Sequence, residues 1–121
     1  MKVGILGCTG RVGSLLATEL YSGAWADQGL ELAGGYCRTI PDGKLPYFVT
    51  DNAEKLFKKS DVVIDFTLPE ATMHHAALAD RLGTTLIVGT TGLTEKQEDE
   101  LLHASENAVI VYAANMSIGV N

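Results

Sequence analysis

The chain has 121 residues, 46% of them hydrophobic and 20% charged, which excludes a disordered protein and predicts one domain that folds without disulfides or a structural metal. A net charge of −6 argues against nucleic acid as a partner, because phosphate binding needs a concentrated basic face.

No apolar run approaches the roughly 20 residues that span a bilayer, and no signal-peptide layout is present, so we expect no membrane insertion. The two cysteines lack metal-like or disulfide-dense spacing, which favours a reducing compartment, the cytoplasm.

The first predicted elements are a strand, a glycine-containing turn and a helix. Residues 2–6 form a short apolar run, and a second strand is predicted over 30–35, before a turn at 41–43. The helix between the strands is predicted over 12–20. Its apolar residues recur at helical spacing: Val12, Leu15, Leu16 and Leu20.

A central strand is predicted over 61–67, because its β-branched run is continuous, as in parallel strands covered on both faces. The helix before it begins with a capping box in which Asp51 is the N-cap and Glu54 the N3 acid. The helix after it runs over 69–82, with Pro69 in its first turn and Gly83 at its end.

The last predicted elements are a strand over 84–88, a helix that begins at a capping box at Thr94, and a strand over 108–113. Leu101 and Leu102 are predicted to point inward from this helix. Strands that alternate with helices in this way predict a Rossmann-type α/β fold, an open parallel sheet with helices on both faces. Such sheets bind ligands beyond the carboxyl ends of their strands.

The chain is predicted to form a single domain over 1–121, with no repeat and no internal linker. Residues 115–121 resemble the beginning of a helix that Asn115 or Ser117 could cap, although no helix body follows. We therefore expect the chain to be a fragment of a longer protein.

Three glycines, Gly7, Gly10 and Gly13, join the first strand to the first helix. In this context the first glycine makes the tight turn, the second lets the backbone approach a phosphate and the third allows close packing of the helix. The amides at the start of the helix attract an anion. The pattern predicts a pyrophosphate-binding loop, although Gly-x-x-Gly-x-x-Gly departs from the commonest spacing, and a tight turn without a ligand is the alternative.

The end of the second strand is the expected ribose site, with Tyr36, Cys37 and Arg38 as the candidates. No acid is present to accept hydrogen bonds from a ribose 2′-hydroxyl. Arg38, together with Arg11, could instead hold a 2′-phosphate, so the sequence favours NADPH over NADH. The alternative for Arg38 is an exposed, solvated arginine.

A loop over 89–92, with the sequence Gly-Thr-Thr-Gly, follows another strand, so its amides and hydroxyls are candidates to bind a nicotinamide or a substrate carboxylate. An ordinary turn is the alternative. Asp65 also ends a strand at the ligand face, where it could neutralise a neighbouring donor, and we assign it no catalytic role.

No metal site is predicted, because His74, His75 and His103 lack the further ligands that zinc needs and are interpreted as solvated or packed. Cys8 has no neighbouring base and is interpreted as a small loop residue. We assign no catalytic residue within the chain, so hydride chemistry would depend on the cofactor and on residues outside it.

Four segments together, in this order and separation, resemble the N-terminal domain of the dihydrodipicolinate reductase family. They are 7–13 (Gly-Cys-Thr-Gly-Arg-Val-Gly), 63–67 (Val-Ile-Asp-Phe-Thr), 89–92 (Gly-Thr-Thr-Gly) and 113–121 (Ala-Ala-Asn-Met-Ser-Ile-Gly-Val-Asn). The resemblance spans the whole chain.

The resemblance implies an oxidoreductase of lysine (diaminopimelate) biosynthesis that reduces 4-hydroxy-tetrahydrodipicolinate to tetrahydrodipicolinate with NADPH or NADH. Thr91 would also touch a carboxylate of this small-molecule substrate. The implied cofactor contacts are Gly7, Cys8, Thr9, Gly10, Arg11 and Val12 for the pyrophosphate, Cys37 and Arg38 for the ribose, and Gly89, Thr90, Thr91, Ala113, Ala114, Asn115 and Met116 around the nicotinamide.

Two departures from the family pattern bear on these expectations. Cys37 stands where many members carry an acid, which weakens the case for strong NADH binding. The family's C-terminal domain, which contributes the catalytic substrate site and builds a homotetramer, lies beyond the hinge at which this chain ends. We expect the fragment, whose own state could be a monomer, to bind cofactor without efficient turnover.

Two other classes are alternatives. One is an NADP-sensing regulatory module of the short-chain-dehydrogenase type, which shares the opening loop but does not require the segments at 89–92 and 115–121. The other is a CoA- or nucleotide-binding domain of an acyl-transferring enzyme, and fold alone does not separate the three classes.

Overall fold

The computed structural model describes residues 1–43 and 45–113. In this part of the chain, six strands form one sheet in the order β3-β2-β1-β4-β5-β6, and every neighbouring pair is parallel. The strands are β1 (Lys2–Leu6), β2 (Glu31–Tyr36), β3 (Val49–Thr50), β4 (Val62–Asp65), β5 (Thr85–Val88) and β6 (Ile110–Tyr112). The predicted Rossmann-type α/β fold is confirmed.

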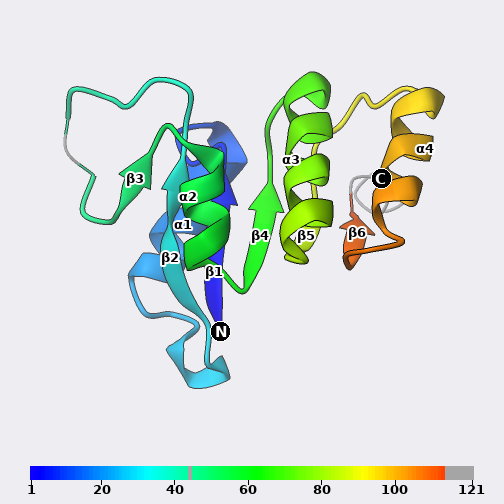
Figure 1. Cartoon of the computed structure of the whole chain (residues 1–121). Helices are drawn as coiled ribbons and strands as arrows, with labels where there is room; N and C mark the ends of the chain where they lie inside the picture. The colour runs from blue at the N-terminus through cyan, green and yellow to red at the C-terminus, as the bar shows by residue number, and fades with distance from the viewer. Residues whose placement is uncertain (44, 114–121) are drawn as a thin grey trace, which may run out of the picture.

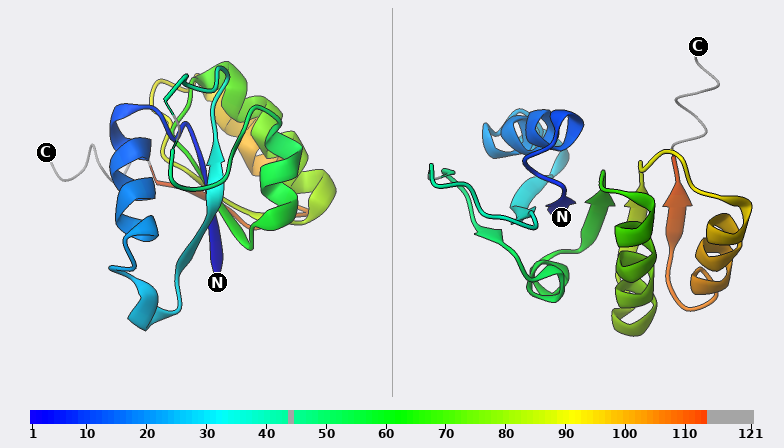
Figure 2. Two further views of the ribbon diagram at one scale, coloured as in Figure 1. Left: turned by 90° about the vertical axis from the view of Figure 1, so that its left-hand side faces the viewer. Right: turned by 90° about the horizontal axis from the view of Figure 1, so that it is seen from above.

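Four α-helices connect the strands: α1 (Arg11–Tyr21), α2 (Ala53–Lys59), α3 (Pro69–Leu82) and α4 (Glu95–Ala104). A short 3₁₀ turn, η1 (Ala26–Gln28), precedes β2. α1 covers one face of the sheet, while α2, α3 and α4 lie in a row on the other face (Figures 1 and 2). The predicted covering of both faces is therefore confirmed.

The order of the strands reverses direction at the centre of the sheet. From β1 the chain builds outward to β2 and β3, and then returns through α2 to place β4 on the other side of β1. The loops after β1 and β4 therefore leave the sheet side by side and lead to helices on opposite faces. Such a switch point opens a crevice at the carboxyl ends of the strands.

The core consists of two apolar clusters, one on each side of the sheet. β1 contributes to both, because Val3 and Ile5 pack toward α1 whereas Leu6 packs toward α2 and α3. On the α2 face, Leu56 and Phe57 are completely or almost completely buried. Because the central strands are covered on both faces, their apolar runs are continuous rather than alternating.

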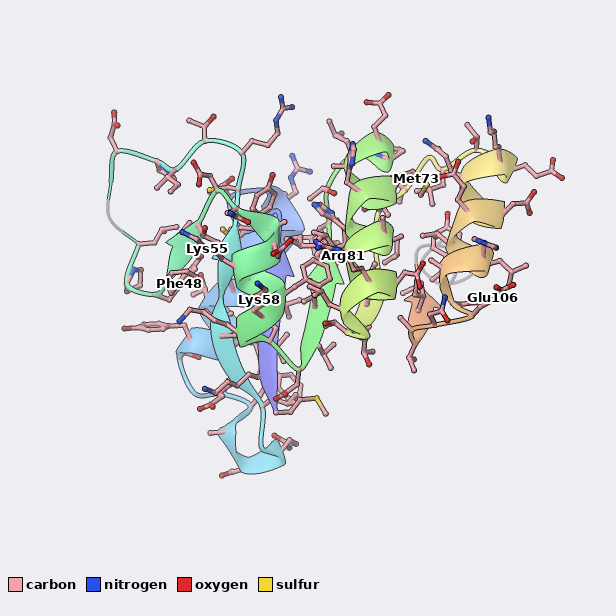
Figure 3. All side chains as sticks on the ribbon, in the orientation of Figure 1. Phe48, Lys55, Lys58, Met73, Arg81 and Glu106 are labelled. Carbon is pink, nitrogen blue, oxygen red and sulfur yellow. The ribbon has the colours of Figure 1, made fainter. Side chains whose placement is uncertain are left out.

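Charged side chains connect α2 to α3 at the surface. Glu54 of α2 binds Lys58 one turn later at 3.2 Å, and it also binds Arg81 near the end of α3. Both cations are labelled in Figure 3. The hydrogen bond from Arg81 is the largest influence that lowers the pKa of Glu54, followed by that from Lys58. The three residues form an exposed ion-pair network.

Some sequence-based expectations about the helices were wrong. Leu102 is 71% exposed, because α4 packs through Leu101 and Ala104 and a neighbouring residue lies about 100° around the helix. The N-cap of α2 is Asn52 instead of Asp51, and its side chain accepts a hydrogen bond from the amide of Lys55. The capping box at Thr94, Pro69 in the first turn of α3 and Gly83 at its end are confirmed.

Candidate functional site

A cleft of about 670 Å³ lies at the switch point, and segments that follow three strands line it. The loop after β1 forms its floor, the end of β2 forms one side, and the loop after β4 with the first turns of α3 forms the other. The lining residues are Gly7, Thr9, Gly10, Tyr36, Cys37, Arg38, Thr39, Phe66, Thr67, Leu68, Glu70, Ala71 and His74. The position agrees with the sequence-based expectation that a ligand binds beyond the carboxyl ends of the strands.

The loop after β1 is held in place by hydrogen bonds to β2. The carbonyl oxygen of Tyr36 accepts hydrogen bonds from the amides of Gly7, at 2.9 Å, and Cys8, at 3.2 Å. Gly7 has φ +86°, a left-handed conformation that residues with a Cβ rarely adopt. The amide of Gly10 then donates to the carbonyl oxygen of Gly7 at 3.0 Å. The turn is therefore tight and rigidly anchored.

Close approach of backbones also requires glycine at two of these positions. A Cβ on Gly7 would lie 2.6 Å from the carbonyl oxygen of Phe66, in the loop after β4. A Cβ on Gly13 would overlap the carbonyl oxygen of Gly7 and lie 2.9 Å from its carbonyl carbon. The helix start is thus pressed against the loop, which the two glycines allow.

The N-terminus of α1 differs from those of α2 and α4. Its N-cap is Gly10, which has no side chain to cap the helix, and its first turn contains no acid. By contrast, side chains cap α2 and α4, and each carries an acidic residue in its first turn. The first amides of a helix have no partner within it and form its positive end. These amides follow Gly10, which lines the cleft, so the helix N-terminus is placed to attract a phosphate bound there.

At the end of β2, Arg38 and Thr39 are exposed and line the cleft, whereas the side chain of Cys37 is buried. Cys8 is buried as well, and its thiol packs against β2 so closely that a Cβ on Gly35 would lie 2.6 Å from its Sγ. Burial and the neighbouring Cys37 raise the pKa of the Cys8 thiol to about 11. Cys8 is therefore a packed thiol, and Arg38 is the charged group on this side of the cleft.

Sequence reasoning placed the end of β4 at the ligand face but missed the side chains of α3 that complete this wall of the cleft. Phe66 packs against the neighbouring loop, because a Cβ on Gly89 would lie 2.8 Å from its Cδ1. Glu70 and His74, one turn apart on α3, are exposed at the cleft. The available signal was the strand end at Asp65, since the helix that follows a strand beside the switch point must flank the crevice.

The loop that follows β5 lies beside this wall, and its two threonines have different environments. Thr90 is 2% exposed, and its hydroxyl oxygen accepts hydrogen bonds from the amide of Thr67 at 3.2 Å and from the hydroxyl of Thr72 at 2.8 Å. Thr91 is exposed. The side chain of Thr90 is therefore engaged internally, and the hydroxyl of Thr91 is available to a ligand.

The cleft brings together only some of the predicted site residues. Its lining includes Gly7, Thr9, Gly10, Cys37 and Arg38. The predicted residues that do not line it are Cys8, Arg11, Val12, Gly89, Thr90, Thr91 and Ala113. Ala114, Asn115 and Met116 lie outside the described residues.

The described residues hold neither a candidate metal site nor a candidate membrane-spanning helix. In residues 1–43 and 45–113, no three histidine, cysteine or acidic side chains are grouped so that they could hold a metal ion. Among the helices of the same residues, none is both long and apolar enough to cross a bilayer. His75, which was interpreted as solvated or packed, is buried at 2% exposure, with its Nδ1 atom 2.8 Å from Oδ2 of Asp65.

Comparisons with known proteins match the whole fold and most of the sequence. The family profile described as "Dihydrodipicolinate reductase, N-terminus" matches residues 1–116. The 4-hydroxy-tetrahydrodipicolinate reductases of Ralstonia pickettii and Burkholderia ambifaria are both 37% identical over 128 positions, which cover all of this chain. The matches cover 49% and 48% of these relatives, so the chain spans about half of their length.

Solved structures with low sequence identity share the fold. A dipicolinate-bound dihydrodipicolinate reductase from Paenisporosarcina sp. TG-14 superposes with a TM-score of 0.66 at 24% identity, over 88% of this chain and 43% of the other. A homoserine dehydrogenase from S. aureus superposes with a TM-score of 0.73 at 15% identity, over 94% and 32% of the two chains.

Proposed function

Because the chain belongs to the family of dihydrodipicolinate reductase N-terminal domains, we propose that it is the dinucleotide-binding part of a 4-hydroxy-tetrahydrodipicolinate reductase. In this role it would serve an NAD(P)H-dependent oxidoreductase of lysine biosynthesis. The observation that carries the proposal is the cleft at the switch point, whose floor is a glycine loop followed by a helix N-terminus without a side-chain cap. The bound cofactor would supply a hydride to the substrate ring.

The fit of a dinucleotide is supported by the backbone of the loop. The first turn of α1 offers amides that no side chain caps, which suits a doubly charged pyrophosphate. Space for the phosphates arises because Gly7 and Gly13 let the loop lie against the helix. We assign the pyrophosphate to residues 7–12, where Cys8 shapes the loop because its amide binds the carbonyl oxygen of Tyr36 and its side chain is buried.

We propose that the adenosine ribose lies at the end of β2 and that Arg38 favours NADPH over NADH. Arg38 is exposed at the cleft, and the residue before it is a buried cysteine instead of an acid. A guanidinium can bind a 2′-phosphate through charge-assisted hydrogen bonds, whereas a carboxylate would repel it. Arg11 is exposed but does not line the cleft, so we give it the smaller share of this role.

The nicotinamide end is assigned to the loop after β5 and, by family resemblance, to residues 113–116. The buried hydroxyl of Thr90 leaves its backbone as the group that would face the nicotinamide. Thr91 is exposed, and we assign it to a substrate carboxylate. We propose that the remaining substrate contacts and the homotetramer of the family need the other half of the full-length relatives, which this chain does not match.

The proposal is tested by titrating NADPH, NADH and CoA separately into the 121-residue chain and measuring heat or ligand fluorescence. Saturable binding of NADPH, with weaker binding of NADH and none of CoA, is the expected result. Tight binding of CoA alone would instead indicate an acyl-transfer protein. If neither nicotinamide cofactor binds, the proposed function is wrong.

The role of Arg38 is tested by Arg38→Ala, with Arg81→Ala as the matched control because Arg81 is also an exposed arginine but binds Glu54 near the end of α3. Charge-assisted contacts contribute about 1.5–3 kcal/mol, so Arg38→Ala should weaken NADPH binding by about one to two decades. NADH binding should change little, and Arg81→Ala should leave both affinities unchanged. Equal losses for the two cofactors would refute the assignment.

A further inference from the structure

The side chain of His75, in the middle of α3, is 2% exposed and lies between the ends of two strands. Its Nδ1 atom is 2.8 Å from Oδ2 of Asp65, the last residue of β4, which is itself completely buried. In the tautomer with the proton on Nδ1, the ring donates a hydrogen bond to this carboxylate oxygen. The ring also meets the ring of Tyr36, at the end of β2, edge-on with centroids 5.8 Å apart.

The second carboxylate oxygen of Asp65 organises the loop that follows β4. Oδ1 accepts hydrogen bonds from the amide of Thr67, at 3.0 Å, and from its hydroxyl, at 2.6 Å. The same amide of Thr67 also donates to the hydroxyl oxygen of Thr90, which receives a second hydrogen bond from Thr72 of α3. Asp65 therefore connects His75 to the loop that follows β5.

Every side chain in this network has a partner. Among the described residues, no buried side-chain nitrogen or oxygen lacks a hydrogen bond. A fully satisfied polar network in a low-dielectric interior has one preferred geometry, because displacing any member leaves another unpaired. The network is thus suited to fixing the distance between the ends of β4 and β5.

We propose that His75 is a positioning residue that holds the loop after β5, through Asp65 and Thr67, in register with the rest of the cofactor cleft. The inference rests on the proposed function, because that loop is assigned to the nicotinamide end. We expect its loss to weaken contacts at one end of the cleft more than at the other. The backbone of the adenosine end is held by the sheet, since Tyr36 pairs with Leu6 and Thr50 there and meets His75 only through its ring.

Loss of the donor from His75 would leave Oδ2 of a completely buried carboxylate without its hydrogen bond. The carboxylate must then rotate toward other donors, and this change alters the hydrogen bonds of Thr67. The loops after β4 and β5 would shift while the sheet pairing of β2 persists. We therefore expect the nicotinamide half of the cleft to suffer more than the adenosine half.

The test compares His75→Leu, which keeps an apolar side chain but no donor, with His75→Asn, whose amide nitrogen is as many bonds from the backbone as Nδ1. Leu101→Ala is the control for loss of stability, because Leu101 is buried in the apolar core and its side chain forms no hydrogen bonds. The probes are NADPH and adenosine 2′,5′-bisphosphate, which represents the adenosine half alone. Binding is measured at a temperature at which circular dichroism shows each variant to be folded.

His75→Leu should weaken NADPH binding by about tenfold, which corresponds to the loss of one charge-assisted hydrogen bond. It should weaken the binding of adenosine 2′,5′-bisphosphate by less than about twofold. His75→Asn should recover most of the NADPH affinity, and Leu101→Ala should change neither affinity. Unchanged NADPH binding by His75→Leu, or equal losses for both probes, would overturn the inference.

A wild-type chain that binds neither probe would instead overturn the proposed function, which keeps the two failures distinct. Should His75→Leu not fold, Thr72→Val decides the matter, because it has the same shape and removes the hydroxyl that donates to Thr90. A loss of affinity for NADPH alone would support the positioning role, and no loss would refute it.

Discussion

Replacing Gly13 by alanine would perturb the proposed phosphate site by displacing the backbone of the loop after β1. Gly13 is buried in the first turn of α1, and an added Cβ would overlap the carbonyl oxygen of Gly7 and lie 3.4 Å from the Cα of Cys8. Both neighbours are backbone atoms. They cannot move freely, because the amides of Gly7 and Cys8 donate to the carbonyl oxygen of Tyr36. The helix start and the loop must therefore separate.

The expected magnitude is the difference between two effects. Overpacking of a well-packed site costs typically about 1–3 kcal/mol, and alanine in a helix is favoured over glycine by about 1 kcal/mol. The free energy of unfolding should thus fall by up to about 2 kcal/mol, which corresponds to a decrease in Tm of up to roughly 10 °C for a domain of this size. Affinity for NADPH should fall by more than about tenfold, since the amides no longer converge on one phosphate.

The assay is thermal unfolding by circular dichroism, with and without NADPH, together with an NADPH titration of the folded variant. Gly10→Ala is the matched control. Gly10 has φ −77° and ψ 174°, which alanine adopts readily, and a Cβ there would lie 3.4 Å from its nearest neighbour, the carbonyl oxygen of Gly7.

Gly10→Ala should therefore change the free energy of unfolding by less than about 1 kcal/mol, while its methyl group at the cleft weakens NADPH binding. If Gly13→Ala retained the wild-type Tm and affinity, the reasoning about the close contact would be refuted.

Three further predictions concern buried polar groups and thiols. Thr90→Val should lower the free energy of unfolding in urea by about 1–3 kcal/mol, because its hydrogen-bond partners are left unpaired. Thr91→Ala should change the same free energy by less than about 0.5 kcal/mol. Similar losses of stability in the two variants would contradict the buried position of Thr90 and the exposed position of Thr91. Burial raises the pKa of Cys8 from 9.0 to about 11 and that of Tyr47 from 10.0 to about 12. The unfolded chain therefore releases protons that the folded chain retains, so stability should fall as the pH rises from 9 to 12, and urea titrations that showed a rise would contradict this sign. Iodoacetamide, which reacts with thiolates, should label Cys8 at pH 8 only after denaturation, as followed by mass spectrometry; rapid labelling of the folded chain would show that the thiol is accessible.

The order of the elements could be predicted from local patterns because each pattern acts over only a few residues. The continuous apolar run at Val62 and Val63 indicated a buried parallel strand, and the capping residues at Thr94 and Gly83 marked helix ends. β3 was not predicted. It has only two residues, and it is a strand because Val49 pairs with Gly35, a contact between distant parts of the chain.

The candidate site also has one part that local sequence patterns predict and another that depends on tertiary packing. The glycine loop could be predicted because the spacing of Gly7, Gly10 and Gly13 reports a backbone conformation and a close approach within one short segment. The part of the opposite wall that α3 forms, with Glu70 and His74, was missed because nothing in its own sequence tells which loop it will face. It faces the glycine loop because β4 lies beside β1.

The sequence by itself determined the α/β class, the turn between the first strand and helix, and the family to which the chain belongs, since each depends on residue types at fixed spacing. Only the tertiary structure decided that Leu102 is exposed, that Cys37 turns its thiol away from solvent, and that His75 pairs with Asp65. The physical reason is that burial and hydrogen-bond partners depend on which elements pack together, and that packing is a property of the whole sheet with its two layers of helices.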